Sequence, residues 1–212
     1  MKGVIFDLDG VIVSTDEYHY QAWKVIADQE GIYFDRRINN RLRGVSRLDS
    51  LNIILERAKR DYRPEEKLAL AEKKNVIYRS SLSKLTPDAI LPGFHELDGF
   101  LKGKNLKMAI GSSSRNTKLI LSKIGLLDDF DVIVDGSMIK RSKPDPEVFL
   151  LAGSLLGFEP KECYVIEDAF AGVEAANRGG FVSIGVGDAS HDEKAAFREA
   201  GLKEVLALLS SR

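Results

Sequence analysis

The sequence has only one cysteine and no long apolar run. Cys163 is the single cysteine among 212 residues, so no disulfide can form within the chain. Because it lies in a strand-like run at residues 163–166, we expect it to be a small core residue. No apolar stretch approaches the roughly 18 residues that span a bilayer, and the first residues lack a signal-peptide pattern. We therefore expect no membrane partner and a cytoplasmic location.

The chain also lacks an excess of charge of either sign. It has 31 Lys and Arg against 32 Asp and Glu, for a formal net charge of −1. No broad positive field attracts nucleic acid, so we expect no nucleic-acid partner. A hydrophobic content of 44% with 30% charged residues is typical of a soluble globular protein. The length fits one domain, or one domain with a smaller insertion, and we expect a monomer.

Short apolar runs alternate with helical patterns over most of the chain. The runs that end in small or acidic residues predict buried strands at Val4–Phe6, Lys107–Ile110, Val132–Val134, Tyr164–Ile166 and Val182–Val186. The helical patterns between and after them are Thr117–Ile124, Pro146–Leu156, Gly172–Arg178 and Asp192–Leu209. This alternation indicates an α/β fold with a doubly wound, Rossmann-like parallel sheet that helices cover on both faces. Ligands bind such sheets beyond the carboxyl ends of the strands.

Residues 16–85 interrupt this alternation. Their patterns predict helices at Glu17–Glu30, Arg36–Leu42, Asp49–Lys59 and Pro64–Ser81. Gly31 and Gly44 suit helix ends, and Pro64 suits a first helical turn. We therefore predict an inserted helical cap domain, residues 16–85, over a core domain made of residues 1–15 and 86–212. Two connections, near residues 14–16 and 84–88, would allow hinging.

Acidic, hydroxyl and lysine side chains follow the predicted strands. Each has an ordinary explanation by itself, since Asp-Gly, serine-rich and Lys-Pro segments are common in turns. At neighbouring carboxyl ends of a parallel sheet, however, they predict a single pocket. Carboxylate and carbonyl oxygens suit Mg²⁺, while a lysine and a serine near a helix start suit a phosphoryl group. The residues are Asp7, Asp9, Ser112, Lys143, Glu167 and Asp168.

The order Asp-x-Asp-Gly, Ser, Lys-Pro and Glu-Asp resembles the haloacid dehalogenase superfamily of phosphoryl-transfer enzymes over the whole chain. The resemblance implies that Asp7 attacks phosphorus while Asp9 gives and takes a proton. It also implies a Mg²⁺ site formed by Asp7, Asp9, Glu167 and Asp168, with Asp9 contributing its backbone carbonyl. Dehalogenases of the superfamily lack the second aspartate, so Asp9 favours phosphate chemistry.

A narrower resemblance is to the glucose-phosphate mutases of that superfamily. Segments Asp16–His19, Ala22-Trp23, Gly44–Arg47, Lys74-Asn75 and Ser112–Asn116 carry it. It implies interconversion of β-glucose 1-phosphate and β-glucose 6-phosphate through an aspartyl phosphate and β-glucose 1,6-bisphosphate. The expected partner is thus a small sugar phosphate. The residues that the resemblance assigns to substrate binding are His19, Trp23, Gly44, Val45, Ser46, Arg47, Lys74, Asn75, Ser112, Ser114, Arg115, Asn116 and Lys143.

Structural roles and two other functions remain open from the sequence. His19 and Trp23 lie one helical turn apart and suit a packed helix face, and Ser46 suits a helix N-cap. A Mg²⁺-dependent phosphatase of small sugar phosphates would share the first half-reaction. It needs no residue such as Arg47 to bind a second phosphate. A receiver-like phosphorylatable signalling module also combines acids, a hydroxyl and a lysine. Receiver modules lack a helical cap of this size, which counts against that reading.

Overall fold

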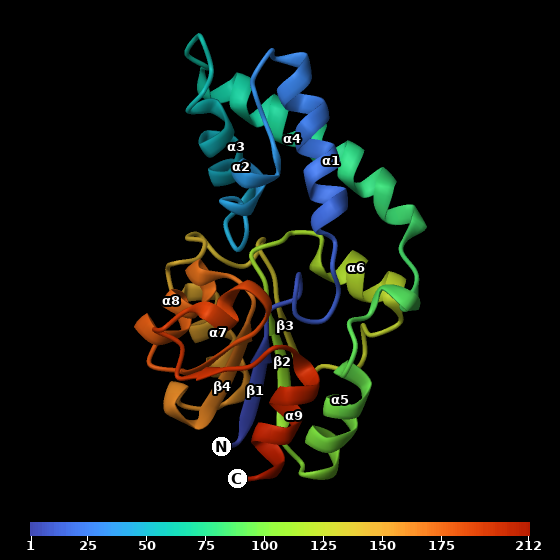
Figure 1. Ribbon diagram of the computed structural model, residues 1–212, viewed down its shortest axis with the longest axis vertical. Coiled ribbons are helices and arrows are strands. Elements are labelled where there is room, and N and C mark those ends of the chain that lie inside the picture. The colour runs from blue at the N-terminus through green and yellow to red at the C-terminus, as the bar shows by residue number, and fades with distance from the viewer.

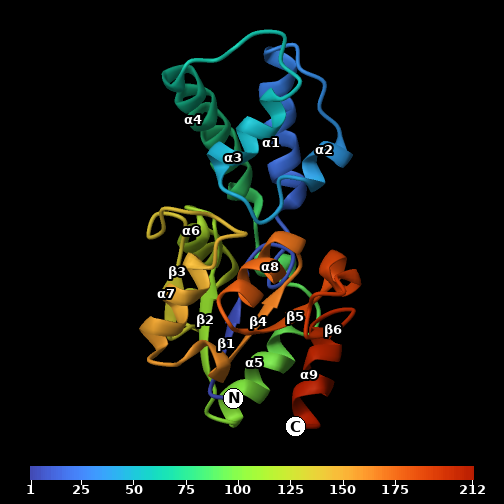
Figure 2. The same ribbon diagram turned by 90° about the vertical axis from the view of Figure 1, so that its left-hand side faces the viewer.

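A six-stranded parallel sheet lies at the centre of the computed structural model, which describes all 212 residues. The strand order is β3-β2-β1-β4-β5-β6 (Figure 2). The first strand therefore lies inside the sheet, with Phe6 in register with Ile110 of β2 and with Ile166 of β4. This pairing brings the carboxyl ends of three strands together. The strands are β1 (Gly3–Phe6), β2 (Lys107–Gly111), β3 (Val132–Val134), β4 (Cys163–Glu167), β5 (Val182–Gly185) and β6 (Phe197–Arg198).

Helices cover both faces of this sheet (Figures 1 and 2). Successive strand residues point to opposite faces, so Phe6 packs into one hydrophobic cluster and Ile5 into another. The cluster of Phe6 includes residues of α5, α6 and α9, and that of Ile5 includes residues of α7 and α8. The bounds of these helices are α5 (Phe94–Gly103), α6 (Thr117–Ile124), α7 (Glu147–Leu156), α8 (Phe170–Arg178) and α9 (Leu202–Ser210).

Four further helices form a bundle over the carboxyl ends of the strands (Figure 1). They are α1 (Asp16–Gln29), α2 (Arg36–Asn40), α3 (Arg47–Leu55) and α4 (Pro64–Ser81), and together we call them the cap. The cap has its own hydrophobic cluster, which includes Trp23 and Ile54 and none of the sheet residues. Ser46 caps α3 by accepting a hydrogen bond from the Asp49 amide, as its sequence context predicted. The division at residues 15–16 and 85–86 stays a prediction.

The predicted fold class is confirmed, and the differences are local. The helix predicted at Asp192–Leu209 is wrong over its first half. There the chain forms β6, which pairs with Ile184–Gly185, and Gly201 precedes the shorter helix α9. The helix α5 was not predicted. The third cap helix ends at Leu55 rather than Lys59, because the amides of Arg57 and Ala58 bond to carbonyls three residues earlier instead of four. Short 3₁₀ turns lie at Leu82–Lys84, Pro87–Ala89, Pro160–Glu162 and Gly187–His191.

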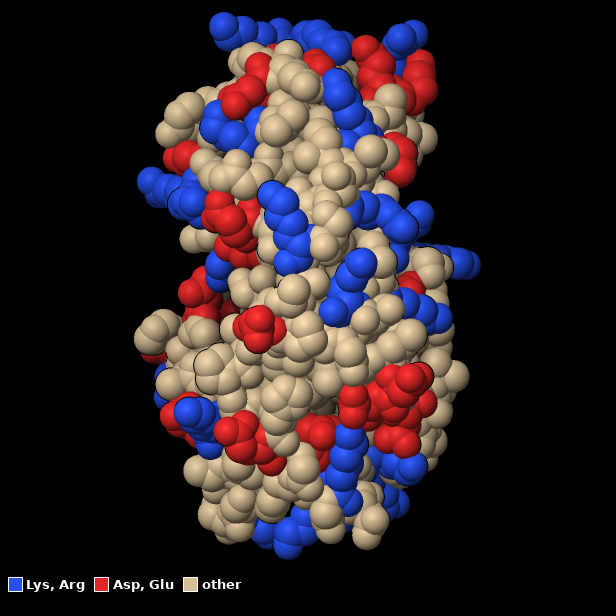
Figure 3. Space-filling view, turned by 90° about the vertical axis from the view of Figure 1, so that its right-hand side faces the viewer, with Lys and Arg blue, Asp and Glu red and all other residues tan.

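Neither sign of charge dominates the face that Figure 3 displays, although acidic side chains gather at one place on the sheet domain. Basic and acidic side chains lie side by side there, over both the cap and the sheet domain. This mixture agrees with the near-zero net charge of the sequence. In addition, none of the helices has the length and apolar character that crossing a membrane requires.

Candidate active site

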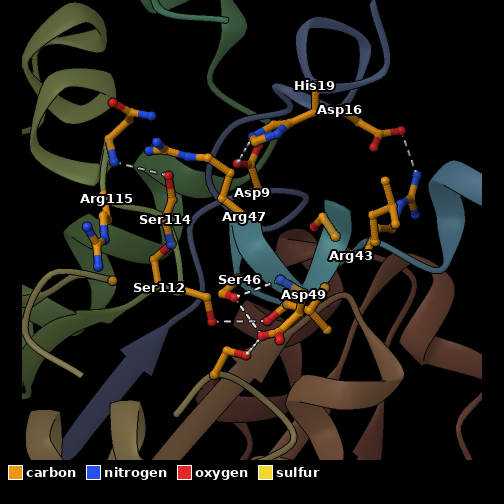
Figure 4. Close-up of a pocket in the computed structure, with 18 of the residues that line it drawn as sticks. Asp9, Asp16, His19, Arg43, Ser46, Arg47, Asp49, Ser112, Ser114 and Arg115 are labelled. Carbon is orange, nitrogen blue, oxygen red and sulfur yellow. Dashed lines mark hydrogen bonds and ion pairs between the residues drawn. The ribbon is translucent and has the colours of Figure 1, made fainter. Parts of the chain in front are cut away.

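A cavity of about 670 Å³ lies between the cap and the carboxyl ends of the strands. Figure 4 shows side chains from both sides facing it, with Arg47 from the cap opposite Ser112 and Ser114 from the sheet domain. Lys143, Glu167 and Asn75 do not line the cavity. Lys143 contacts Asp7 and Asn75 contacts Asn116, both of which line it, and Glu167 lies behind them, bonded to Lys143. The predicted site residues that line it are Asp7, Asp9, His19, Trp23, Gly44, Val45, Ser46, Arg47, Lys74, Ser112, Ser114, Arg115, Asn116 and Asp168.

A buried lysine holds two acids together on the floor of the cavity. Lys143 Nζ donates to Asp7 Oδ1 at 2.6 Å and to Glu167 Oε1 at 2.5 Å, and its side chain is fully buried. Burial acts to lower the pKa of Lys143, but the carboxylates of Asp7 and Glu167 outweigh it and keep that pKa above its ordinary value. Lys143 therefore stays charged. The bond from Lys143 fixes Asp7 Oδ1, and the other carboxylate oxygen of Asp7 has no bond to Lys143.

The acids at this end of the sheet provide a donor set that fits a divalent cation. Oxygens of Asp7, Glu167 and Asp168 lie within 4.8 Å of one another. The two oxygens of Glu167 already accept from Lys143 and, at 2.9 Å, from the Ala169 amide. Burial, and then the charges of Glu167 and Asp7, raise the pKa of Asp168 well above its ordinary value. A hard cation would relieve this repulsion, so Asp7 and Asp168 are the better direct ligands, with Glu167 behind them.

Gly10 lets Asp168 approach the loop after β1. Its φ is +81°, which favours glycine, and a Cβ atom there would lie 2.0 Å from Asp168 Oδ2. The glycine that ends the Asp-x-Asp-Gly motif is thus required by packing as well as by the turn. The metal role of the Asp9 carbonyl stays a prediction.

Thr15, which directly precedes cap helix α1, binds the side chain of Asp9. Asp9 Oδ1 accepts from the Thr15 amide at 2.8 Å and from Thr15 Oγ1 at 2.5 Å, while Thr15 Oγ1 is 2.8 Å from the Tyr78 hydroxyl. Burial raises the pKa of Asp9 to about 6, although the two bonds from Thr15 act to lower it. A carboxyl with such a pKa exists in both protonation states near neutral pH. This property suits a group that gives and takes a proton.

His19 and Lys74 meet in the cap beside Asp9. Lys74 Nζ is 2.8 Å from His19 Nδ1, and His19 Nε2 is 3.7 Å from Asp9 Oδ2. Burial, and then Arg47, lowers the pKa of Lys74 to about 7. Burial, and then Lys74, lowers the pKa of His19 well below its ordinary value, so His19 is neutral and its Nδ1 can accept from Lys74. Trp23 lies under this pair, with its ring centroid 5.0 Å from Lys74 Nζ.

Two arginines provide positive charge away from the acidic floor. Arg47 begins α3 in the cap, and Arg115 follows Ser114 in the loop after β2 (Figure 4). Arg47 donates to Glu72 at 3.1 Å, yet burial and the charge of Arg115 lower the pKa of Arg47. A phosphate between these groups would offset their repulsion, and guanidinium groups bind phosphate oxygens in pairs.

The predicted binding residues Asn75 and Asn116 bond to each other. Asn116 Nδ2 donates to Asn75 Oδ1 at 3.0 Å, and Asn116 Oδ1 accepts from Arg79 at 3.3 Å. Both ends of the Asn116 amide are thus engaged by α4. This contact joins the cap to the loop after β2.

Several residues at the site were not predicted. Arg43 donates to Asp16 at 2.9 Å and to Asp188 at 2.5 Å, which links the cap to the turn after β5. Thr15 and Tyr78 support Asp9. The spacing of four between Lys74 and Tyr78 on one helix face could have indicated Tyr78. Arg43 carried no comparable signal.

Comparisons with known proteins agree with this geometry. The family model for haloacid dehalogenase-like hydrolases matches residues 1–180. The β-phosphoglucomutase of Bacillus subtilis (strain 168) is 48% identical over 189 residues, which cover 88% of this chain and 84% of that protein. The phosphorylated carbohydrates phosphatase of Thermotoga maritima is 33% identical over 205 residues, covering 95% and 92% of the two chains. A crystal structure of β-phosphoglucomutase from Clostridium difficile superposes with a TM-score of 0.92 and 37% identity over the whole of both chains.

Proposed function

The chain belongs to the haloacid dehalogenase-like hydrolase family, and from this premise we propose that it is a β-phosphoglucomutase. Its substrates would be β-glucose 1-phosphate and β-glucose 6-phosphate, and its cofactor Mg²⁺. The observation that carries the proposal is the presence of two separate groups of cationic side chains at one cavity, each suited to bind a phosphate. Asp7, with Lys143 behind it, lies at the floor, and Arg47 and Arg115 provide a second cationic site.

The first half-reaction transfers a phosphoryl group between Asp7 and a sugar oxygen. An Asp7 carboxylate oxygen forms the bond to phosphorus while the bond from phosphorus to the sugar oxygen breaks. Asp9 donates its proton to the departing oxygen, which leaves as a hydroxyl. Lys143 and Ser112 hold the transferring group, and Mg²⁺ bound at Asp7 and Asp168 would neutralise its charge.

The second half-reaction uses the same residues in the opposite direction. β-Glucose 1-phosphate binds with its own phosphate between Arg47 and Arg115 and presents its 6-hydroxyl to the aspartyl phosphate. Asp9 accepts the proton of that hydroxyl as its oxygen attacks phosphorus, and the Asp7 carboxylate is released. The β-glucose 1,6-bisphosphate formed in this way turns end for end, so that its 1-phosphate faces Asp7 and enters the first half-reaction, which leaves glucose 6-phosphate. The pKa of Asp9, about 6, supports both roles at neutral pH. Water has to be excluded from the covalent intermediate throughout, and the cap supports this.

A phosphatase acting on small sugar phosphates is the second candidate. The similarity to the Thermotoga maritima phosphatase favours it, because the first half-reaction would be the same and only the acceptor would be water. The residues Arg47 and Arg115 favour the mutase, since a phosphatase has no need to retain a second phosphate. The small sugar-phosphate partner belongs to either proposal. The cytoplasmic location and the monomeric state stay predictions.

One assay separates the candidates. The protein is given β-glucose 1-phosphate, Mg²⁺ and a trace of β-glucose 1,6-bisphosphate, and glucose 6-phosphate and free phosphate are measured together. We expect glucose 6-phosphate in large excess, and no product from the Asp7→Asn variant. Free phosphate without glucose 6-phosphate would identify a phosphatase. Labelling of Asp7 without turnover of any sugar phosphate would instead support a signalling module.

A further inference from the structure

A single side-chain hydrogen bond joins helix α3 of the cap to the loop that carries Lys143. Ser142 Oγ donates to Asp49 Oδ2 at 2.7 Å, and the same oxygen accepts from Ser46 Oγ at 2.5 Å (Figure 4). We propose that Ser142 and Asp49 are positioning residues that hold the cap against this loop and so favour phosphoryl transfer to a sugar over loss to water. The inference rests on the proposed mutase function and adds a determinant of its selectivity.

Ser142 provides the side-chain hydrogen bond between the Lys143 loop and the cap. It directly precedes Lys143, whose Nζ is 2.6 Å from Asp7 Oδ1. The rest of the loop is anchored within the sheet domain, because the amides of Lys140 and Arg141 donate to the carboxylate of Glu147 at 3.1 and 2.9 Å. The loop therefore keeps these anchors when the cap lifts, and the contact of Ser142 is the one that is lost.

The acceptor is well suited to this task. Asp49 is exposed and forms no ion pair, so its charge is not already neutralised by a neighbouring lysine or arginine. Its orientation is fixed by Ser46, which donates to its carboxylate and also accepts from its amide at 3.2 Å. A bond from a hydroxyl to a pre-oriented carboxylate loses little side-chain entropy and is stronger than one between neutral groups.

The other polar contacts between cap and sheet domain lie away from Lys143 in the chain. Arg43 pairs with Asp188, whose side chain is 56% exposed, and such ion pairs contribute little in water. Ser113 donates to the Gly44 carbonyl at 3.0 Å. Loss of the Ser142 bond would therefore release from the cap the segment that directly precedes Lys143, the residue that contacts Asp7. Water would then reach the aspartyl phosphate more often.

The first test compares Ser142→Ala with the wild-type enzyme in the assay that follows glucose 6-phosphate and free phosphate. We expect the ratio of free phosphate to glucose 6-phosphate to rise about fivefold, which corresponds to ~1 kcal/mol and to a partly exposed hydrogen bond to a charged group. Ser142→Thr, which keeps the hydroxyl, should restore the ratio. Ser210→Ala is the matched control, because it removes an exposed hydroxyl bonded within α9, far from the cavity.

A double-variant cycle and a structural readout complete the test. Asp49→Ala should raise the ratio by itself, and Ser142→Ala should add nothing in its presence. Amide hydrogen exchange in residues 46–56 and 138–146 should increase in Ser142→Ala but not in Ser210→Ala. An unchanged ratio, additive effects or unchanged exchange would each overturn the inference. If the wild-type enzyme releases only phosphate, the mutase function fails, and the exchange measurement still decides whether the contact holds the cap.

Discussion

Replacing Lys143 by methionine tests whether this lysine is what keeps Asp7 and Glu167 together under the cavity. Methionine has a similar volume and no charge, so the packing is largely kept while Asp7 and Glu167 lose the donor at 2.6 and 2.5 Å. Removing one partner of a buried ion pair typically costs about 3–5 kcal/mol. For a chain of this length each kcal/mol corresponds to a fall of about 2–4 °C in Tm, so we expect a decrease of about 6–20 °C at pH 7.5 without Mg²⁺.

The pH dependence of this loss has a definite sign. Burial raises the pKa of Glu167 from its ordinary 4.5 to about 7 in the folded protein, even though Lys143 acts to lower it. A carboxyl whose pKa is raised by folding destabilises the folded state as the pH rises from its unfolded to its folded pKa. Without Lys143 the pKa of Glu167 rises further. The deficit of the variant relative to the wild type should therefore be smaller near pH 5, where only the pair with Asp7 is lost, than at pH 8.

Thermal unfolding followed by circular dichroism between pH 5 and pH 8 measures this effect. Lys161→Met is the matched control, since Lys161 is exposed and forms no ion pair with these acids. A variant that loses less than about 1 kcal/mol, or whose deficit does not grow with pH, would refute the role of Lys143 as the charge that balances the buried carboxylates.

Three further substitutions test single contacts of the site. Thr15→Val removes the hydroxyl that lowers the pKa of Asp9, so the apparent pKa assigned to Asp9 in the pH profile of kcat/KM should rise by about one unit. An unchanged apparent pKa would contradict its assignment to Asp9. Arg47→Ala should reduce transfer between sugar phosphates about 30-fold more than hydrolysis of a simple phosphate monoester, whereas equal losses would remove Arg47 from the second phosphate site. Gly10→Ala places a Cβ 2.0 Å from Asp168 Oδ2 at a φ of +81°. It should lower the free energy of unfolding by about 1–2 kcal/mol in denaturant titrations and raise the Mg²⁺ concentration needed for activity, and an unaltered Mg²⁺ requirement would count against Asp168 as a ligand.

That the acids meet at one edge of the sheet could be predicted from the sequence, because strand ends are local features. Asp7 follows an apolar run that forms β1, and Glu167 and Asp168 lie at the end of the run that forms β4. In a parallel sheet these ends necessarily meet at one edge, so residue type and position were enough. The edge strand β6 was missed because two residues carry no periodicity, and they become a strand only by pairing with β5.

Side-chain partners across the cavity were harder to predict. Asn75 and Asn116 are 41 residues apart, and their bond depends on how α4 lies against the loop after β2. Arg43 likewise reaches Asp188 only because the cap covers the sheet. The family resemblance assigned both asparagines to substrate binding, and it did not indicate their bond to each other. Such contacts follow from the placement of two packed units, which no local pattern encodes.

The separate hydrophobic cluster of the cap has a consequence for how new specificities arise. Trp23, Ile54 and their neighbours pack among themselves, and the sheet residues beneath Asp7 belong to other clusters. Substitutions on the cavity-facing side of α2 and α3 can thus change the shape of the wall that the cap contributes to the cavity. The residues at the carboxyl ends of the strands keep their packing. A laboratory library confined to those helices, with Arg47 and Asp49 kept, would vary this wall of the cavity without altering the packing beneath Asp7.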